Sequence, residues 1–201
     1  MALSKIDVAN MLTGATPVAN GGTALTSGTS GQFLKFTGTT TLASAADNTG
    51  KVNQLITANA TSQTETTGTT YVDTAITASI TPSATNSKIL IYITDCVQFF
   101  HTNSHDDNGM SFRIKRTIGG SAATLVSDNN HYEGFYSSDR NGTDHNRRQH
   151  MSWHFVDTTH NTTNAITYMH QFNVYRGNDN AKGRSVHDNN RGNITLMEIL
   201  A

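Results

Sequence analysis

The histidines are the residues of this chain whose type and placement most suggest chemistry. All nine lie after residue 100, and His150 and His154 fall four positions apart in a segment of alternating apolar and polar residues. In a β-strand such residues share a face but stand about 13 Å apart, at ~3.3 Å per residue. They cannot bind one metal ion within a single chain, because each ligand must lie about 2.1 Å from a zinc ion. Only sharing around a three-fold axis would make them metal ligands; we favour polar surface residues and expect no metal.

A second group combines aromatic residues with a long polar loop. Aromatic rings cover the apolar face of a sugar, and Asn, Asp and Arg hydrogen-bond its hydroxyls. The sequence therefore predicts a glycan or receptor contact at this loop, and a contact with a neighbouring protein is the alternative. The predicted contact residues are Tyr132, Phe135, Tyr136, Asp139, Arg140, Asn141, Asp144, His145 and Arg147.

Calcium binding and catalysis have weaker signals. The segment 105–109 is acidic, but it lacks the ligand spacing and the downstream glutamate of a calcium loop, so we expect a plain turn. The sequence has no Gly-x-Ser-x-Gly turn and no phosphate loop. Glu133, Asp139 and Asp144 are the carboxylates that a glycosidase could use, without any sign of a cleft between them. We therefore expect no catalytic residue, no cofactor and no enzymatic activity.

Composition limits the class of protein further. The net charge is -1 and only 14% of residues are charged, which disfavours nucleic acid and membrane partners. Hydrophobic residues make up 35%, below the roughly 45–50% usual for a globular domain. The chain is rich in threonine and has two prolines, which favours β-structure over disorder. Together these features predict β-strands that complete their core by self-association.

Targeting and redox signals are few. The first twelve residues carry Lys5 and Asp7 and lack the apolar core of a secretory signal, and no stretch reaches the ~20 apolar residues of a membrane span. We expect neither. Cys96 is the single cysteine, which rules out an intramolecular disulfide. Its apolar neighbours predict a buried, small hydrophobic residue.

Three zones of different composition follow one another. Residues 1–46 are rich in small residues and glycine and resemble an extended arm, with one short strand at 32–36. Residues 47–70 form a Thr-rich segment, either a linker or shaft, or a first polar strand pair. Residues 71–201 carry about eight strand patterns and no convincing helix. The predicted fold class is all-β, an extended arm followed by a jelly-roll-like antiparallel β-sandwich.

Several strands within 71–201 have clear patterns. The run 89–93 is continuously apolar and predicts a strand buried on both sides. Gly119-Gly120 predicts the turn of a hairpin, and Asn108-Gly109 and Asn141-Gly142 predict further turns. In the segment 150–155, Met151, Trp153 and Phe155 should share one face, opposite the two histidines. The last strand is predicted at 194–200.

Two parts of the sequence resemble a known group of proteins. The string from Ala2 to Thr23, with Pro-Val-Ala-Asn-Gly-Gly-Thr at 17–23, resembles the start of virion structural proteins of tailed bacteriophages of the tail-fibre, head-fibre and decoration types. The segments 70–74, 80–83, 87–91 and 194–199 resemble the compact β-sandwich tip of such proteins. The resemblance covers about half of the chain, and residues 97–193 depart from it through their His, Asn, Asp and Arg content.

The resemblance implies a role and partners. It implies a homotrimer in the virion, assembled in the host cytoplasm and attached through its arm to other virion proteins such as capsid, portal, tail or fibre adaptor. The expected function is a fibre or spike that binds a host surface glycan or receptor. A capsid decoration or cement protein is the alternative, and a polysaccharide-degrading enzyme is less favoured. The expected attachment residues are Leu3, Ile6, Val8, Met11, Leu12, Pro17 and Val18.

Overall fold

The computed structural model of this chain describes residues 28–39, 41–45, 51–102, 108–121, 124–129, 134–137, 145–177 and 180–200. The chain divides into two compact units, Met1–Thr49 and Gly50–Ala201. Within the described ranges the regular structure is β-strand, apart from one short 3-10 helix, η2, at His187–Asn189. None of the helical structure in those ranges is long and apolar enough to cross a membrane. The predicted all-β class is confirmed.

The first unit contains a small hairpin. Strands β1 (Phe33–Phe36) and β2 (Leu42–Ala45) pair antiparallel, which confirms the strand predicted at 32–36. All four residues of β1 are exposed, including Phe33 at 64% and Phe36 at 64%. A two-stranded hairpin is only marginally stable in water without a further layer. The described part of this unit therefore leaves large apolar side chains uncovered.

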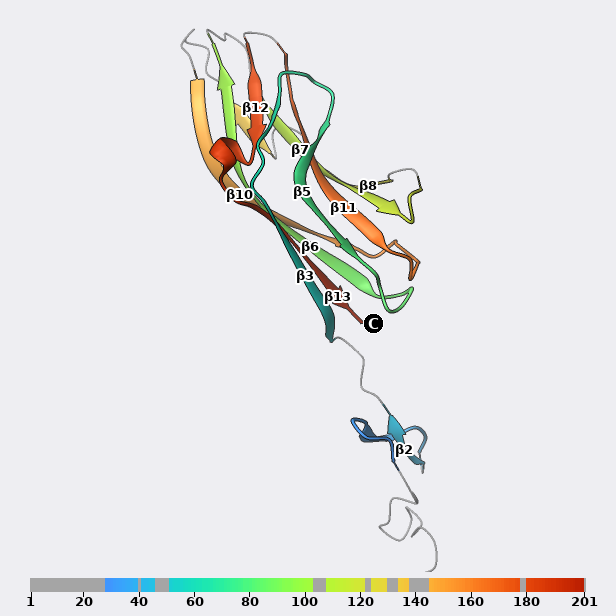
Figure 1. Cartoon of the computed structure of the whole chain (residues 1–201). Helices are drawn as coiled ribbons and strands as arrows, with labels where there is room; N and C mark the ends of the chain where they lie inside the picture. The colour runs from blue at the N-terminus through green and yellow to red at the C-terminus, as the bar shows by residue number, and fades with distance from the viewer. Residues whose placement is uncertain are drawn as a thin grey trace, which may run out of the picture. The chain divides into compact units, whose positions relative to one another are not determined.

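The second unit is a sandwich of two antiparallel sheets (Figure 1). One sheet has the order β3-β13-β6-β12-β4, and β10 pairs with the other edge of β6. Its strands are β3 (Val52–Ala60), β4 (Thr64–Thr66), β6 (Lys88–His101), β10 (His145–Asp157), β12 (Lys182–Ser185) and β13 (Gly192–Ile199). The other sheet has the order β5-β11-β7-β8, and β9 also pairs with β7. Its strands are β5 (Val72–Ile80), β7 (Asn108–Ile118), β8 (Thr124–Asn129), β9 (Phe135–Ser137) and β11 (Ile166–Val174).

The core lies between the inner faces of these sheets. Side chains of a strand point alternately to its two faces, and most inward positions here are apolar. One cluster gathers around Ile91, Ile114 and Leu196, and a second gathers around Phe99 and Phe172. Burying such a side chain contributes about 1.5–3 kcal/mol relative to exposure. The predicted antiparallel β-sandwich is confirmed.

The face assignment of the segment 150–155 is also confirmed. Met151, Trp153 and Phe155 of β10 pack against the two core clusters, and His150 and His154 are exposed on the opposite face. The hairpin at Gly119-Gly120 joins β7 and β8, and both glycines have positive φ. The last strand, β13, matches the predicted position.

Other details of the sequence interpretation are wrong. The run 89–93 is buried on one side only, because Tyr92 on the outer face of β6 is 40% exposed. Cys96 also lies on that outer face and is half-buried rather than part of the core. An antiparallel sheet needs only one covered face, so an apolar run does not require two covering layers.

The Thr-rich segment 47–70 contributes two strands to the six-stranded sheet. Strand β3 pairs with β13 and strand β4 pairs with β12, so they do not pair with each other. Burial alternates along both strands: Thr64 and Thr66 of β4 are half-buried, whereas Thr57 of β3 is exposed. Threonine suits this partly buried pleated surface, which is why a low-complexity sequence is compatible with regular strands.

The turn predicted at Asn108-Gly109 is wrong, because both residues lie inside β7. The Asn108 side chain accepts hydrogen bonds from the backbone N–H groups of Gly109 and Arg176, at 2.8 and 3.0 Å. Glycine is required here by close approach of β9: a Cβ at Gly109 would lie 1.9 Å from the carbonyl oxygen of Phe135. This contact fixes β9 against the rest of the sheet.

We expect Gly109→Ala to lower the free energy of unfolding by about 3 kcal/mol, because the added methyl group meets backbone that cannot move without breaking the β7–β9 pairing. Urea denaturation measures this loss. Gly68→Ala is the matched control, because a Cβ there would make only ordinary contacts at 3.7 and 3.9 Å. Equal stability of the two variants would contradict the proposed packing of β9.

Candidate functional site

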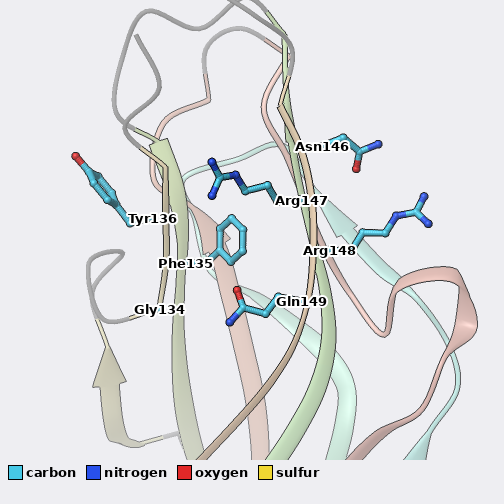
Figure 2. Close-up of a pocket in the computed structure, with 7 residues that line it drawn as sticks. All are labelled: Gly134, Phe135, Tyr136, Asn146, Arg147, Arg148 and Gln149. Atoms are coloured by element: carbon cyan, nitrogen blue, oxygen red, sulfur yellow. The ribbon is translucent and has the colours of Figure 1, made fainter. Parts of the chain in front are cut away.

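A pocket opens where an edge strand of one sheet faces an edge strand of the other. Its volume is about 480 Å³, and it lies between β9 and the amino-terminal half of β10 (Figure 2). The residues that line it are Gly134, Phe135, Tyr136, Asn146, Arg147, Arg148 and Gln149.

Both faces of the amino-terminal half of β10 are exposed. Residues 146–150 are all exposed, and β10 pairs only with β6 among the described strands. Successive side chains therefore point to opposite sides of the strand. Arg147 and Gln149 point toward Phe135, whereas Asn146 and Arg148 point to the other side (Figure 2). The β10 side chains that point toward Phe135 are therefore the guanidinium of Arg147 and the amide of Gln149.

The wall formed by β9 is held rigidly. Phe135 is 7% exposed, and its ring lies 5.9 Å from that of Phe99 in the core. Gly134 leaves no room for a side chain, since a Cβ there would lie 2.4 Å from the carbonyl oxygen of Met110. Rigid elements position binding groups more accurately than loops do. The pocket therefore has a fixed apolar floor.

The charges in this pocket favour an anionic or hydroxylated ligand. The Arg147 side chain has no hydrogen bond or ion pair with any residue that the structure describes, and Arg148 lies 3.6 Å from Asp188. None of the lining residues is acidic. A guanidinium offers paired N–H donors that match a carboxylate, and an amide both donates to and accepts from hydroxyls.

The pocket unites part of the predicted contact. Phe135, Tyr136 and Arg147 line it together, although contact with a ligand stays a prediction. His145 is 8% exposed and its ring stacks on that of His101 at 4.7 Å, so it supports the start of β10 instead of lining the pocket. The other predicted contact residues lie outside the described residues: Tyr132, Asp139, Arg140, Asn141 and Asp144.

Sequence reasoning missed Gln149, although the signal was present. The alternation that assigned Met151 and Trp153 to one face, continued backward, gives Arg147 and Gln149 the same face. Gly134, Asn146 and Arg148 were missed for another reason, since pairing between distant strands decides their place. The expected attachment residues all lie outside the described residues: Leu3, Ile6, Val8, Met11, Leu12, Pro17 and Val18.

The two histidines considered as metal ligands lie on the outer face of the six-stranded sheet. His150 and His154 are both exposed and stand opposite Cys96 and Tyr92 of β6. Within the described residues, no group of three His, Cys, Asp or Glu side chains could hold a metal ion. Sharing of an ion between copies stays a prediction.

A Ser-His-Asp group is present in the core, but its geometry differs from a catalytic triad. Ser185 Oγ donates to Asp95 Oδ2 at 2.6 Å, and His170 Nδ1 lies 3.6 Å from the same oxygen. In a triad the histidine stands between the other two residues. Each of these three residues is at most 1% exposed, so a substrate has no access to them in this structure.

Burial also sets the ionisation of this group. It lowers the pKa of His170 to about 3, and neither ring nitrogen has a hydrogen-bond partner among the described residues. Burial raises the pKa of Asp95, and hydrogen bonds from Ser185 and the Val186 N–H partly oppose that shift. Since the pKa of His170 falls, the imidazole is neutral in the folded protein at neutral pH.

We expect the protein to lose stability on mild acidification because of His170. The pKa of His170 is lower in the folded state than in the unfolded state. The contribution of the neutral imidazole to the free energy of unfolding is therefore present above about pH 6.5 and is lost as pH falls toward 3. Between pH 7 and pH 5 the loss is about 2 kcal/mol. The raised pKa of Asp95 acts in the opposite direction and remains in a His170→Phe variant.

Urea denaturation at the two pH values measures this effect as a difference between proteins. His170→Phe should remove about 2 kcal/mol of the pH dependence, which is the contribution of a neutral, buried imidazole. His154→Phe makes the same substitution at an exposed position and is the matched control. If wild type and His170→Phe respond equally to pH, the imidazole is not held neutral by burial.

Comparison with known proteins finds similar solved structures but no matching family. No protein-family model matches the chain, and no curated protein matches it. One similar solved structure is that of infectious bursal disease virus, Gx strain, which is 12% identical and has a TM-score of 0.38. The similarity covers 83% of this chain and 41% of that chain. The VP2 subviral particle of the same virus gives 13% identity and a TM-score of 0.37, with 83% and 42% covered. The chain spans about two fifths of these proteins, and at such values the likeness supports no conclusion about function.

Proposed function

We propose that this chain is a structural protein of a bacteriophage particle, a trimeric fibre or spike that attaches through its amino-terminal arm and binds the host surface through its β-sandwich. The pocket between β9 and β10 is the observation that carries this proposal. It combines Phe135, Tyr136 and Arg147 at the exposed edge of a rigid sandwich. These residues belong to the part of the chain that departs from the resembling phage proteins, where a host-specific contact is expected.

Uncovered apolar surface supports self-association. Phe33, Leu34 and Phe36 of β1 are each more than half exposed. On the outer face of the six-stranded sheet, Leu55 and Val156 are 59% and 39% exposed. They end a row of four apolar side chains that stand opposite one another across neighbouring strands, namely Val156, Leu90, Met197 and Leu55.

The outer face of the five-stranded sheet has a different character. Lys115 forms an ion pair with Asp73 at 2.6 Å, and Arg113 donates to Gln171 at 2.6 Å. This face suits contact with water, whereas the apolar row suits contact with protein, because contiguous exposed apolar patches mark interaction sites. Three copies would bring three host-binding pockets to one surface, and their combined binding would exceed that of each copy.

A capsid decoration or cement protein is the second candidate. The apolar row would then cover a neighbouring capsid subunit, and the pocket would bind nothing on the host. A polysaccharide-degrading enzyme is less favoured, because the lining residues include no pair of carboxylates. Release of reducing sugar from host polysaccharide by the purified protein would favour the enzyme instead.

We expect the purified protein to bind host cells and to slow phage adsorption by competition. Arg147→Ala should reduce cell binding at least tenfold, because loss of one charge-assisted contact costs about 1.5–3 kcal/mol. Lys88→Ala, at the far end of β6, removes the same charge outside the pocket and is the control. Binding to undecorated capsids, with none to cells, would favour the cement protein.

We expect light scattering to give the mass of a trimer in dilute solution. Replacing Phe33 and Phe36 together by Ser should weaken the trimer at least tenfold, because covering each ring contributes about 1.5–3 kcal/mol. Lys35→Ser, in the same strand, should leave assembly unchanged. A stable monomer of the full chain would contradict the proposal.

A further inference from the structure

A second pocket lies on the outer face of the six-stranded sheet, beside the bare end of β10. Its volume is about 350 Å³. Its walls are two rows of three side chains that stand opposite one another on β10, β6 and β12. The rows are Arg148, Gln98 and Arg184, followed by Asn146, Phe100 and Lys182.

A chain of hydrogen bonds orients this outer pocket. Arg184 Nε donates to Glu65 Oε2 at 2.6 Å, and Arg184 Nη1 donates to Gln98 Oε1 at 2.7 Å. Gln98 Nε2 in turn donates to Asn146 Oδ1 at 2.5 Å. Gln98 is only 3% exposed, so the middle of this chain is fixed in the sheet surface. The polar groups are therefore arranged before a ligand arrives, which lowers the entropy cost of binding.

The outer pocket keeps an excess of positive charge. Three cationic side chains line it, and two neighbouring carboxylates, Glu65 and Asp188, partly offset them. Among the described residues, Arg148 and Lys182 make only long ion pairs, at 3.6 and 3.9 Å, so they retain donors for a ligand. No acidic residue lines the pocket itself. Half-buried Phe100 adds an aromatic surface between the charges.

The two pockets lie on opposite sides of the amino-terminal half of β10. Asn146 and Arg148 line both of them, and Arg147 and Arg148 are consecutive residues that point to opposite sides of the strand (Figure 2). Because β10 is an edge strand within the described sheet, a chain molecule can pass from one side to the other around it. Both sides offer the same combination of guanidinium, amide and aromatic ring.

We propose that the exposed amino-terminal half of β10 binds a linear anionic polysaccharide. Arg147 holds one acidic sugar unit in the pocket between β9 and β10. Arg148, Lys182 and Arg184 hold another acidic unit in the outer pocket. This inference rests on the proposed host-binding function and names its ligand class. Arginine binds a carboxylate through two parallel N–H donors, and Phe135 and Phe100 cover the apolar faces of the sugar rings. The amides bind hydroxyls between the charged groups.

The test compares ligands that differ only in charge or in length. Calorimetry measures binding of oligogalacturonates of two and eight units, and of the methyl ester of the longer one. We expect the eight-unit acid to bind at least tenfold more tightly than the two-unit acid, because it reaches both pockets. Esterification should abolish most of the binding, and added salt should weaken it, because the contacts are ionic.

Variants locate the two contacts. Arg147→Gln and the double variant Lys182→Gln with Arg184→Gln should each weaken binding of the eight-unit acid at least tenfold. Lys88→Gln is the matched control: it removes one charge from the same outer face, twelve residues along β6, which is about 40 Å away at ~3.3 Å per residue. Arg184→Lys keeps the positive charge and should therefore keep part of the binding. This result would show that the glutamine variant loses binding because it loses charge and not because it misfolds.

Three comparisons between ligands could overturn this inference. They are equal binding of acid and ester, equal binding of short and long acids, and equal binding of single-stranded DNA of the same charge. Retained binding in the Lys182 and Arg184 variant would also overturn it. The proposed host-binding function is tested by a different measurement, because it is contradicted if the wild-type protein does not bind host cells. Failure of the function and failure of the ligand class are therefore distinguishable.

Discussion

The structure depends on the inward face of β6, the longest strand in the part of the chain that the structure describes. Ile89, Ile91, Ile93, Val97 and Phe99 are fully buried along one side of this strand and contribute to both core clusters. The edges of β6 position two of the strands that carry the candidate sites: β10 pairs along one edge, and β12 pairs along the other edge, which it shares with β13. The third strand, β9, pairs with β7 in the other sheet. Packing of one apolar face thus determines the placement of polar residues on the other.

Buried carboxylates hold the strands in place around this core. Asp157 accepts from Arg116 and from the Tyr168 hydroxyl at 2.6 and 2.7 Å, which connects the two sheets. Glu198 accepts from the side chains of Asn53 and Gln54 and from the backbone of Ser83. Burial alone would raise the pKa of Glu198, but these donors lower it to about 2. A buried charge with several donors is costly to disrupt, and its loss would release several strands together.

The candidate sites arise where this regular packing ends. Strand β9 is three residues long, whereas β10 extends thirteen residues along β6, so the end of β10 has no covering layer among the described strands. Its arginines are therefore exposed on both sides, and the pockets form beside them. Edge strands of this kind are exposed to pairing with other chains, and charged residues such as Arg147 and Arg148 reduce that tendency. The same charges can serve solubility and recognition.

The sequence alone determined the β-class, the inward face of β10 at Trp153 and the hairpin at Gly119-Gly120, because each follows from local periodicity or backbone preference. It could not determine that Gly109 lies within a strand, since that depends on the close approach of Phe135, a residue distant in the chain. The sequence had grouped Phe135 and Arg147 at one predicted contact, because both flank the same polar loop. The tertiary structure alone decided that β9 and β10 form a pocket at these residues and that Arg148 joins Arg184 on the opposite face. Strand pairing over long separations sets these neighbours, and local sequence carries no record of which strands pair.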